Sequence, residues 1–234
     1  MQPTPLQPSG AGSLTLVGGA ACLDFANTSS GRGTPLRQEH LRSYDLLLIW
    51  AEHARVIARA ERRRLARRST QQPRAAARVL RRALALREAI HASGAALARG
   101  APPPAAALAV VNRELAAAMT QARLRPAAGG FVWDFAAAPP ALDSVLRPLV
   151  RSAAELLLAP LRDRVKQCPG HGCGWIFLDL TKNRNRRWCE MEVCGSRAKV
   201  SRYRERQRKL NHRVTEPQRR HRERNEANKR PEGE

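Results

Sequence analysis

The stretch CPGHGCGWIFLDLTKNRNRRWCEMEVC, residues 168–194, decides the fold of the last third of this 234-residue chain. It holds two cysteine pairs of the same CxxxxC spacing, Cys168 with Cys173 and Cys189 with Cys194, separated by 15 residues. Zinc prefers four soft ligands at the corners of a tetrahedron, and two facing cysteine loops supply four thiolates from one chain. The spacing therefore predicts one structural zinc ion, with no open coordination position for catalysis.

Other interpretations of the cysteines are weaker. Four unrelated buried cysteines are disfavoured because the two spacings are identical and Gly or Pro lies in or beside the loops. His171 lies inside the first loop and is an alternative ligand, but Cys173 completes the set without it. The fifth cysteine, Cys22, stands alone between Ala and Leu, and we expect a small buried residue there rather than a redox sensor.

The residues around the cysteine pairs predict a small α+β zinc finger of the zinc-ribbon or treble-clef type. The run 175–180 is typical of a strand and the basic segment 181–187 of a turn, so we expect a hairpin that links two metal-binding knuckles. A helix is expected to follow Gly195, with a narrow apolar stripe formed by Val200, Tyr203 and Leu210.

The first two thirds of the chain predict a mainly helical domain. Residues 1–13 are rich in Pro, Gln and Gly and are expected to be flexible, with folded structure beginning near Leu14. Helical spacing of apolar residues recurs in four segments, which start at Ser43, at Pro73, after Pro104 and after Pro140. The expected buried faces of the first three are Leu46, Trp50, Ala54 and Ile57; Val79, Ala83, Leu86, Ile90 and Leu97; and Leu108, Val111, Leu115 and Met119.

Two local features qualify this helical pattern. Pro148 is expected to kink the last of these helices or to mark its restart. RLRPAAGGFVWDF, residues 123–135, predicts a small β-hairpin that turns at Gly129 and Gly130. Alternation places three aromatic residues on one of its faces, where core packing is the expected role, as for Trp50; they are Phe131, Trp133 and Phe135.

Basic residues dominate the charge, which is +22, and only five of the 42 are lysines. The parts before and after position 161 each carry a net charge of +11, but the second part has only 73 residues. Polyanions are the natural partners of such a chain. No apolar run reaches the roughly 18 residues of a membrane span and no signal peptide is evident, so we expect a cytoplasmic protein without membrane contact, whose clustered cysteines bind metal.

Basic side chains on the turn and on the following helix are the candidate nucleic-acid contacts. A zinc-fixed helix beside a basic loop suits contact with a groove and with phosphates, and guanidinium groups can also bind guanine edges. The candidates are Arg184, Arg186, Arg187, Arg197, Lys199, Arg202, Arg206 and Lys209.

The residues GWIFLDLTKNRNRRWCEMEVCGSRAKVSRYRERQR, 174–208, resemble the CGNR zinc finger of bacterial proteins. The name-giving motif corresponds here to Cys194, Gly195, Ser196 and Arg197. Ser196 replaces the family's Asn; it is a small polar residue able to cap the helix or bond the backbone, and it is a further candidate contact. CLDFANT, residues 22–28, followed by DLLLIWAEHA, resembles the ABATE domain that precedes this finger.

The resemblance implies a bacterial transcription regulator whose finger binds DNA and whose N-terminal domain acts as a sensor. In CLDFANT, ligand contacts by Asp24 and Asn27 are an alternative, but a turn that caps a helix is the expected role. A single finger has a small footprint on DNA, so a homodimer is also expected. No small-molecule ligand of the N-terminal domain can be named.

The sequence thus predicts four parts: a flexible N-terminus (1–13), an ABATE-like helical domain (14–160), a CGNR-like zinc finger (161–210) and a disordered charged tail (211–234). The expected function is DNA-binding transcription regulation, at the nucleoid when bound. The alternatives are an RNA-binding protein and a zinc-dependent protein-interaction adaptor. An enzyme is not expected, because no Ser-His-Asp set, phosphate loop or open metal site is evident.

Overall fold

The computed structural model describes residues 10–32, 34–35, 37–134 and 141–208. The chain divides into two compact units, Met1–Cys189 and Glu190–Glu234. Lys209, Leu210, Phe135 and the predicted tail lie outside the described residues, as do residues 1–9. The first element among the described residues is the 3-10 helix η1 (Ala11–Ser13), in which Ala11 is buried, so ordered structure is present slightly before the expected start near Leu14.

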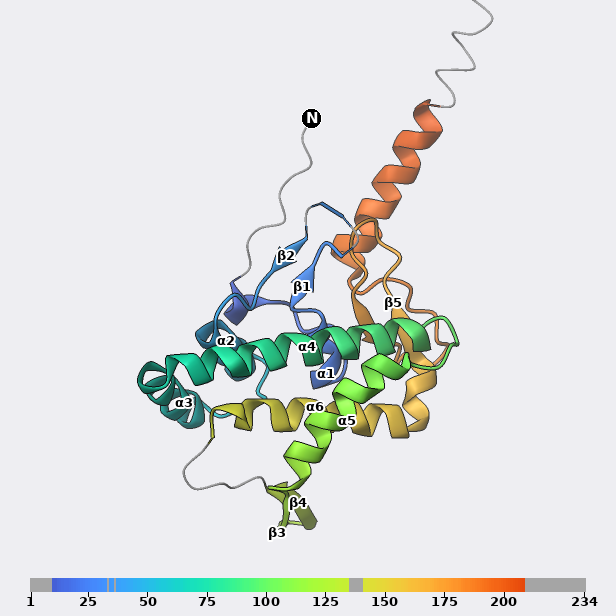
Figure 1. The fold of residues 1–234 in the computed structure, drawn as a ribbon. Helices are drawn as coiled ribbons and strands as arrows, with labels where there is room; N and C mark the ends of the chain where they lie inside the picture. Colours follow the sequence, from blue (N-terminus) through green and yellow to red (C-terminus); the bar gives the residue numbers. More distant parts are fainter. Residues whose placement is uncertain (1–9, 33, 36, 135–140, 209–234) are drawn as a thin grey trace, which may run out of the picture. The chain divides into compact units, whose positions relative to one another are not determined.

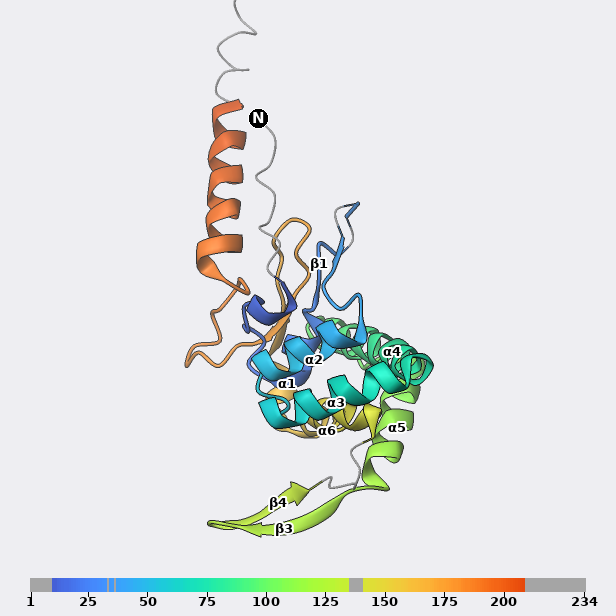
Figure 2. The same cartoon turned by 90° about the vertical axis from the view of Figure 1, so that its left-hand side faces the viewer.

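The first unit is organised around the long helix α4 (Pro73–Leu97). As predicted, Pro73 occupies its first turn, where the missing N–H costs nothing. The chain leaves the helix at Gly100, whose φ is +69°. Several helices pack against α4, among them α1 (Ala21–Ala26), α5 (Ala105–Met119) and α6 (Leu146–Leu158), as Figures 1 and 2 show.

Helix α2 (Tyr44–His53) begins where the sequence predicts. The Ser43 side chain caps it by accepting a hydrogen bond from the N–H of Leu46 (3.2 Å). Trp50 is fully buried and packs against Phe25 of α1, with ring centroids 5.3 Å apart. The helix is shorter than the apolar pattern because it ends before Arg55, whose φ is +56°.

Helix α3 (Arg59–Gln71) was not predicted from the sequence. Its only buried residue is Leu65, so it has no repeating apolar stripe that a periodicity argument could detect. The helix forms from residues of good helical propensity, mainly arginine and alanine, and Leu65 anchors it in the core.

Helix α5 buries a different face from the predicted one. Leu108 and Leu115 are half-buried and Met119 is exposed, whereas the inward face consists of Ala107, Val111, Glu114 and Ala118. The physical reason is an ion pair: Glu114 is 3 % exposed and accepts hydrogen bonds from Arg82 of α4, the shortest at 2.8 Å. The spacing of apolar residues alone cannot predict a buried helix face that has a carboxylate at its centre.

The predicted restart at Pro148 is confirmed. A 3-10 helix, η2 (Leu142–Val145), leads into α6, and Pro148 lies in the first turn of α6. There its missing N–H interrupts no helical hydrogen bond.

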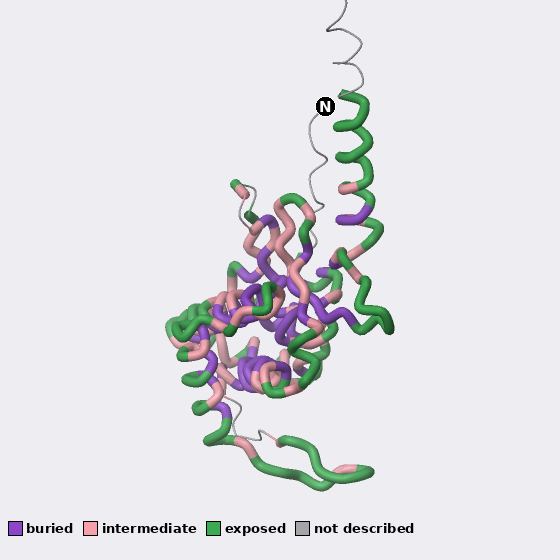
Figure 3. The backbone as a smooth tube through the Cα atoms, turned by 90° about the vertical axis from the view of Figure 1, so that its right-hand side faces the viewer, coloured by how far each residue is buried: buried purple, intermediate pink, exposed green. Residues whose placement is uncertain are grey.

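The hairpin β3 (Arg123–Ala127) and β4 (Gly130–Asp134) forms in the predicted place, with Leu124 opposite Trp133. The expectation that its aromatic residues pack in the core is wrong, because Phe131 is 73 % and Trp133 40 % exposed. Figure 3 shows that nearly the whole hairpin is exposed and that the buried residues gather among the helices.

Two short sheets complete the first unit: β1 (Ser29–Ser30) with β2 (Gln38–Glu39), and β5 (Val165–Gln167) with β6 (Ile176–Leu178). A 3-10 helix, η3 (Pro160–Arg164), precedes β5. The predicted strand at 175–180 is present as β6, but it pairs with the strand that precedes it in the sequence, β5. The first cysteine loop is therefore the turn of this hairpin. The hairpin therefore does not link the two knuckles.

The second unit contains a single π-helical turn, η4 (Met191–Gly195), and a helix over residues 196–208. The predicted fold class, a mainly helical domain with a small hairpin and a small α+β zinc finger, is confirmed. Among the described residues, no helix combines the length and apolar character needed to cross a membrane.

Gly94 of α4 provides a test of how closely this helix approaches the hairpin β5–β6. A methyl group there would lie 2.9 Å from Cγ2 of Ile176, a stiff branched side chain. Although alanine favours helix by about 1 kcal/mol, we expect Gly94→Ala to lower the free energy of unfolding by about 1–3 kcal/mol through overpacking. Urea denaturation followed by circular dichroism measures this.

The control is Ala85→Gly at an exposed position of the same helix, which should cost about 1 kcal/mol through propensity alone. Unchanged or increased stability of Gly94→Ala would contradict the close approach.

Candidate metal centre and nucleic-acid interface

The first cysteine pair is held by the hairpin β5–β6. Cys168 follows β5 directly, and its N–H donates a hydrogen bond across the hairpin to the carbonyl of Trp175 (2.8 Å). Gly172 and Gly174 flank Cys173, and their φ angles of +70° and +67° lie in the left-handed region that favours glycine. These turns bring the Cys173 side chain back toward Cys168.

The second pair lies around the π-helical turn η4. The N–H of Cys194 donates to the carbonyl of Glu190 (3.0 Å), which closes the turn. Ser196 begins the following helix, and its hydroxyl donates to the carbonyl of Met191 (3.3 Å). Serine therefore bonds the backbone here, as the sequence predicts for the residue that replaces the family's Asn.

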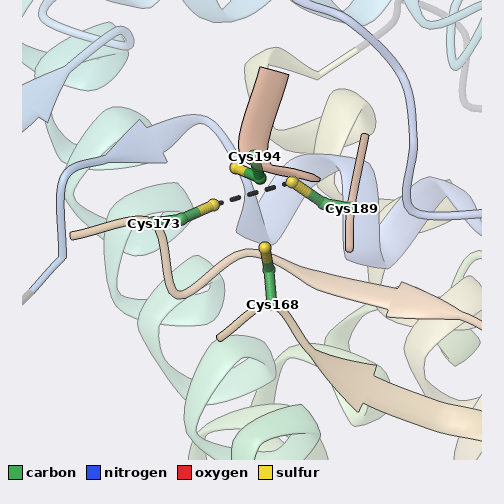
Figure 4. A group of neighbouring side chains, drawn as sticks. All are labelled: Cys168, Cys173, Cys189 and Cys194. Atoms are coloured by element: carbon green, nitrogen blue, oxygen red, sulfur yellow. Dashed lines mark hydrogen bonds between the residues drawn. The ribbon is translucent and has the colours of Figure 1, made fainter. Parts of the chain in front are cut away.

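The four sulfur atoms of Cys168, Cys173, Cys189 and Cys194 all lie within 4.8 Å of one another (Figure 4). The sulfurs of Cys173 and Cys189 are 3.6 Å apart. A disulfide bond would need about 2 Å, whereas a tetrahedron with Zn–S bonds of about 2.3 Å has edges of roughly 3.8 Å. The donors therefore fit one zinc ion. When bound, zinc would join the two cysteine loops with all four positions occupied by protein.

The remaining candidates for metal chemistry lie apart from this cluster. Among the described residues, the cluster of side chains close enough together to bind one metal ion consists of the four cysteines, and His171 does not belong to it. Cys22 is fully buried in α1, where its N–H donates to Oγ of Ser152 (3.2 Å). Burial raises the pKa of the Cys22 thiol to about 12, so this residue stays a protonated core side chain.

The hairpin β5–β6 is also bound to the helices of the first unit. The side-chain amide of Asn27, at the end of α1, bonds both the N–H and the carbonyl of Ile176, each at 2.9 Å. The N–H of Leu178 donates to the carbonyl of Gly18 (2.8 Å). Ile176, Phe177 and Leu178 are all buried. The strand that follows the first cysteine loop is therefore part of the helical unit's core.

His91 of α4 supports the cysteine loop itself. Its Nε2 lies 2.9 Å from the carbonyl oxygen of Gly174, to which it donates when that nitrogen carries the proton. Burial, together with the nearby charge of Arg32, lowers the pKa of His91 to about 4. The imidazole is therefore neutral at pH 7 and acts as a hydrogen-bonding support.

Asp24 has a structural partner as well. Its carboxylate accepts a hydrogen bond from the N–H of Gly18 (2.7 Å), and burial raises its pKa to about 6 even though this bond acts in the opposite direction. Asp24 and Asn27 thus organise the segment around α1, which accounts for their polar groups without a ligand.

The side chain of Arg186, a predicted nucleic-acid contact, is bound to the backbone of the first unit. Its guanidinium lies 4.3 Å from the ring centroid of Phe177. It donates hydrogen bonds to four carbonyl oxygens, those of Val17 (3.0 Å), Leu178 (3.2 Å), Trp188 (3.2 Å) and Cys189 (2.6 Å). Four of the five N–H groups of the side chain are therefore committed to the fold. Through these hydrogen bonds, Arg186 stabilises the loop that carries Cys189.

Asp179 is a structural residue that the sequence analysis missed. It is fully buried directly after β6 and forms an ion pair with Lys166 (2.6 Å). Its carboxylate also accepts hydrogen bonds from the N–H groups of Thr181 (3.0 Å) and Arg186 (2.9 Å). Burial alone would raise the pKa of Asp179, but these partners hold it well below its usual range. An acidic residue inside the apolar run 175–180 was the available sign of this role.

The other candidate contacts are exposed. Arg184 and Arg187 lie on the turn 181–187, where Arg187 is placed over the ring of Trp188, 5.1 Å from its centroid. On the helix 196–208, the exposed candidates are Ser196, Arg197, Lys199, Arg202 and Arg206. Val200 and Tyr203 of the predicted apolar stripe are exposed too, at 47 % and 63 %.

The metal site can be tested with Cys189→Ser. Loss of one thiolate from a four-thiolate site should reduce bound zinc from one equivalent to below about 0.1 after dialysis against a weak chelator. Metal analysis of the purified protein measures this. Cys22→Ala should retain one equivalent, because Cys22 lies outside the cluster; equal zinc in both variants would rule out the assigned ligands.

The support from His91 predicts a pH dependence. Its pKa in the folded protein, about 4, lies below the unfolded value of 6.5, so its contribution to stability is complete above pH 6.5 and is lost as the pH falls toward 4. Between pH 8 and pH 5 the loss should be about 2 kcal/mol. His91→Gln retains an N–H donor for Gly174 but does not titrate.

We would measure the free energy of unfolding of His91→Gln and of the parent protein at pH 5 and at pH 8. The comparison isolates the contribution of His91 to the pH dependence, because zinc release affects both proteins alike. The stability deficit of the variant should shrink at pH 5. Parallel pH profiles would show that His91 does not titrate as the structure requires.

Family comparisons match the two parts of the chain in order. Residues 19–160 match the ABATE family, described as "Putative stress-induced transcription regulator", and residues 164–207 match the CGNR zinc finger. No curated protein matches the chain. The ABATE match spans more than half of the sequence, and the CGNR match contains all four cysteines of the cluster. The chain belongs to the ABATE family and carries a C-terminal CGNR zinc finger.

Proposed function

We propose that this protein is a DNA-binding transcription regulator in which the zinc finger presents the helix 196–208 to DNA. The observation that carries this proposal is the exposed basic helix that starts two residues after the zinc ligand Cys194. Membership of a family described as transcription regulators supports the same conclusion.

The charge of this helix suits a nucleic-acid ligand. Residues 196–208 include six basic side chains and one acidic side chain, Glu205. All residues from 199 to 208 are exposed. An α-helix fits the major groove of B-DNA, where arginine can bind guanine edges as well as phosphates. Zinc at Cys194 would restrain the start of the helix and so reduce the entropy lost on binding.

The turn 181–187 supplies a second basic element of the finger. Its backbone is held by the buried carboxylate of Asp179 and by Lys166, whose Nζ donates to the carbonyl oxygens of Arg184 (2.5 Å) and Arg186 (3.1 Å). The exposed side chains of Arg184 and Arg187 therefore project from a well-held loop. Such a loop suits phosphate contacts, which position a protein without reading sequence.

Selection of bound sequences from random DNA duplexes tests the proposal. The zinc-loaded protein is used at about 150 mM salt, where nonspecific binding is weak, beside a sample treated with EDTA. Enrichment of a motif only in the zinc-loaded sample supports a sequence-specific regulator. Binding without enrichment would refute it, and preference for structured RNA at matched salt would favour the RNA-binding alternative.

Neighbouring arginines on the turn offer a matched comparison. Arg184→Gln combined with Arg187→Gln should leave the melting temperature unchanged and make the slope of log K against log salt shallower by about 2, roughly one for each lost phosphate contact. Arg186→Gln should instead destabilise the protein by about 1–3 kcal/mol, because it strands buried carbonyl groups.

Fluorescence anisotropy on a duplex and thermal unfolding separate these two effects. If Arg186→Gln affected only DNA binding, or the double variant only stability, the division of roles between the three arginines would be wrong.

A further inference from the structure

Helices α3 and α4 carry a basic surface that is remote in sequence from the finger. Residues 58–87 contain eleven arginines and a single acidic residue, Glu61. Seven of these arginines are exposed and form no ion pair with any described residue. This α3–α4 arginine surface consists of Arg59, Arg63, Arg64, Arg67, Arg74, Arg78 and Arg81.

Helical geometry gathers these side chains on outward faces. Arg59, Arg63 and Arg67 follow one another at four-residue spacing, about 6 Å apart along α3, on the side opposite the buried Leu65. Along α4, Arg74, Arg78 and Arg81 face away from the buried residues Val79 and Ala83. Gln72 joins the two helices directly, and α3 packs beside the beginning of α4 (Figure 1).

Elsewhere in the first unit, many arginines have carboxylate partners. Arg87 is 2 % exposed and pairs with Glu39 (2.6 Å) and Glu88 (2.9 Å), which also pairs with Arg32. On α3, Arg62 pairs with Glu52. The α3–α4 arginine surface differs because its local carboxylate, Glu61, accepts a hydrogen bond from Ser144 (3.2 Å) instead.

Uncompensated arginines at four-residue spacing repel one another and disfavour the helix that carries them. An extended polyanion removes this repulsion, and guanidinium groups bind phosphate oxygens in a bidentate manner. A membrane surface fits less well, because membrane-bound helices insert large apolar side chains. None of the large exposed apolar side chains among the described residues lies on α3 or α4.

We propose that the α3–α4 arginine surface binds the phosphate backbone of double-stranded DNA. This site goes beyond the proposed function, because it assigns the helical unit a contact of its own that does not read sequence. It adds salt-dependent affinity to whatever selectivity the finger provides.

The test compares two triple variants of the full-length protein. Arg59→Gln/Arg63→Gln/Arg67→Gln neutralises the line on α3 with residues of similar helical propensity. Arg42→Gln/Arg99→Gln/Arg123→Gln removes the same charge from exposed positions elsewhere in the first unit. Affinity for a duplex of about 30 base pairs and arbitrary sequence is measured from roughly 50 to 200 mM salt.

The α3 variant should make the slope of log K against log salt shallower by about 2–3, and the control by less than about 1. Equal changes in both variants, or an unchanged slope in the α3 variant, would overturn the proposal. Loss of binding to phosphatidylserine vesicles with unchanged duplex affinity would overturn it as well, in favour of a membrane surface.

Repeating the comparison with Arg197, Arg202 and Arg206 all changed to Gln separates this site from the finger. Salt-dependent duplex binding should persist in that protein. It should be lost when the three α3 substitutions are combined with the three finger substitutions in one chain. If neutralising the finger has no effect on affinity, the proposed function fails while this inference stands. If it abolishes all duplex binding, the arginine surface is not a DNA site.

Discussion

The two hydrogen bonds between the Asn27 amide and the backbone of Ile176 are the constraint on which the rest of the structure depends. Strand β6 pairs with β5 on one side only, and its buried backbone groups need partners on the other. Asn27 and Gly18 provide them from positions about 150 residues earlier. Three of the four zinc ligands lie in the unit that these bonds hold together, so the metal site is supported by a packed core.

Arginine has two physically distinct roles in this chain. Where it is buried or half-buried, it bonds extensively to other groups of the protein, as Arg186 does with four carbonyls and Arg87 with two carboxylates. Where it is exposed, on α3 and on the helix 196–208, the charge faces solvent and is available to a polyanion. Arginine thus stabilises the loop that carries Cys189 and also forms the surfaces for which we propose DNA binding.

Local patterns predicted much of the fold and of the metal site. Cysteine spacing identified the four ligands, and Pro73 and Gly100 bracketed α4, because zinc geometry and helix termination act over a few residues. Helix α3 escaped prediction because Leu65 alone is buried, and the face of α5 was wrong because Glu114 is buried as an ion-pair partner. The sequence pattern of the hairpin β3–β4 predicted its place in the chain but not its exposure.

By itself, the sequence determined the zinc ligands, most helices and the basic character of the finger, since each follows from spacing or composition within a short segment. Only the tertiary structure decided that β6 pairs with β5, that Asn27 completes the edge of that strand, and that Arg186 is structural whereas Arg184 and Arg187 are exposed. These outcomes depend on which distant groups meet once water is excluded. A buried polar group must be satisfied by whatever partner the packing provides, and no local pattern specifies that partner.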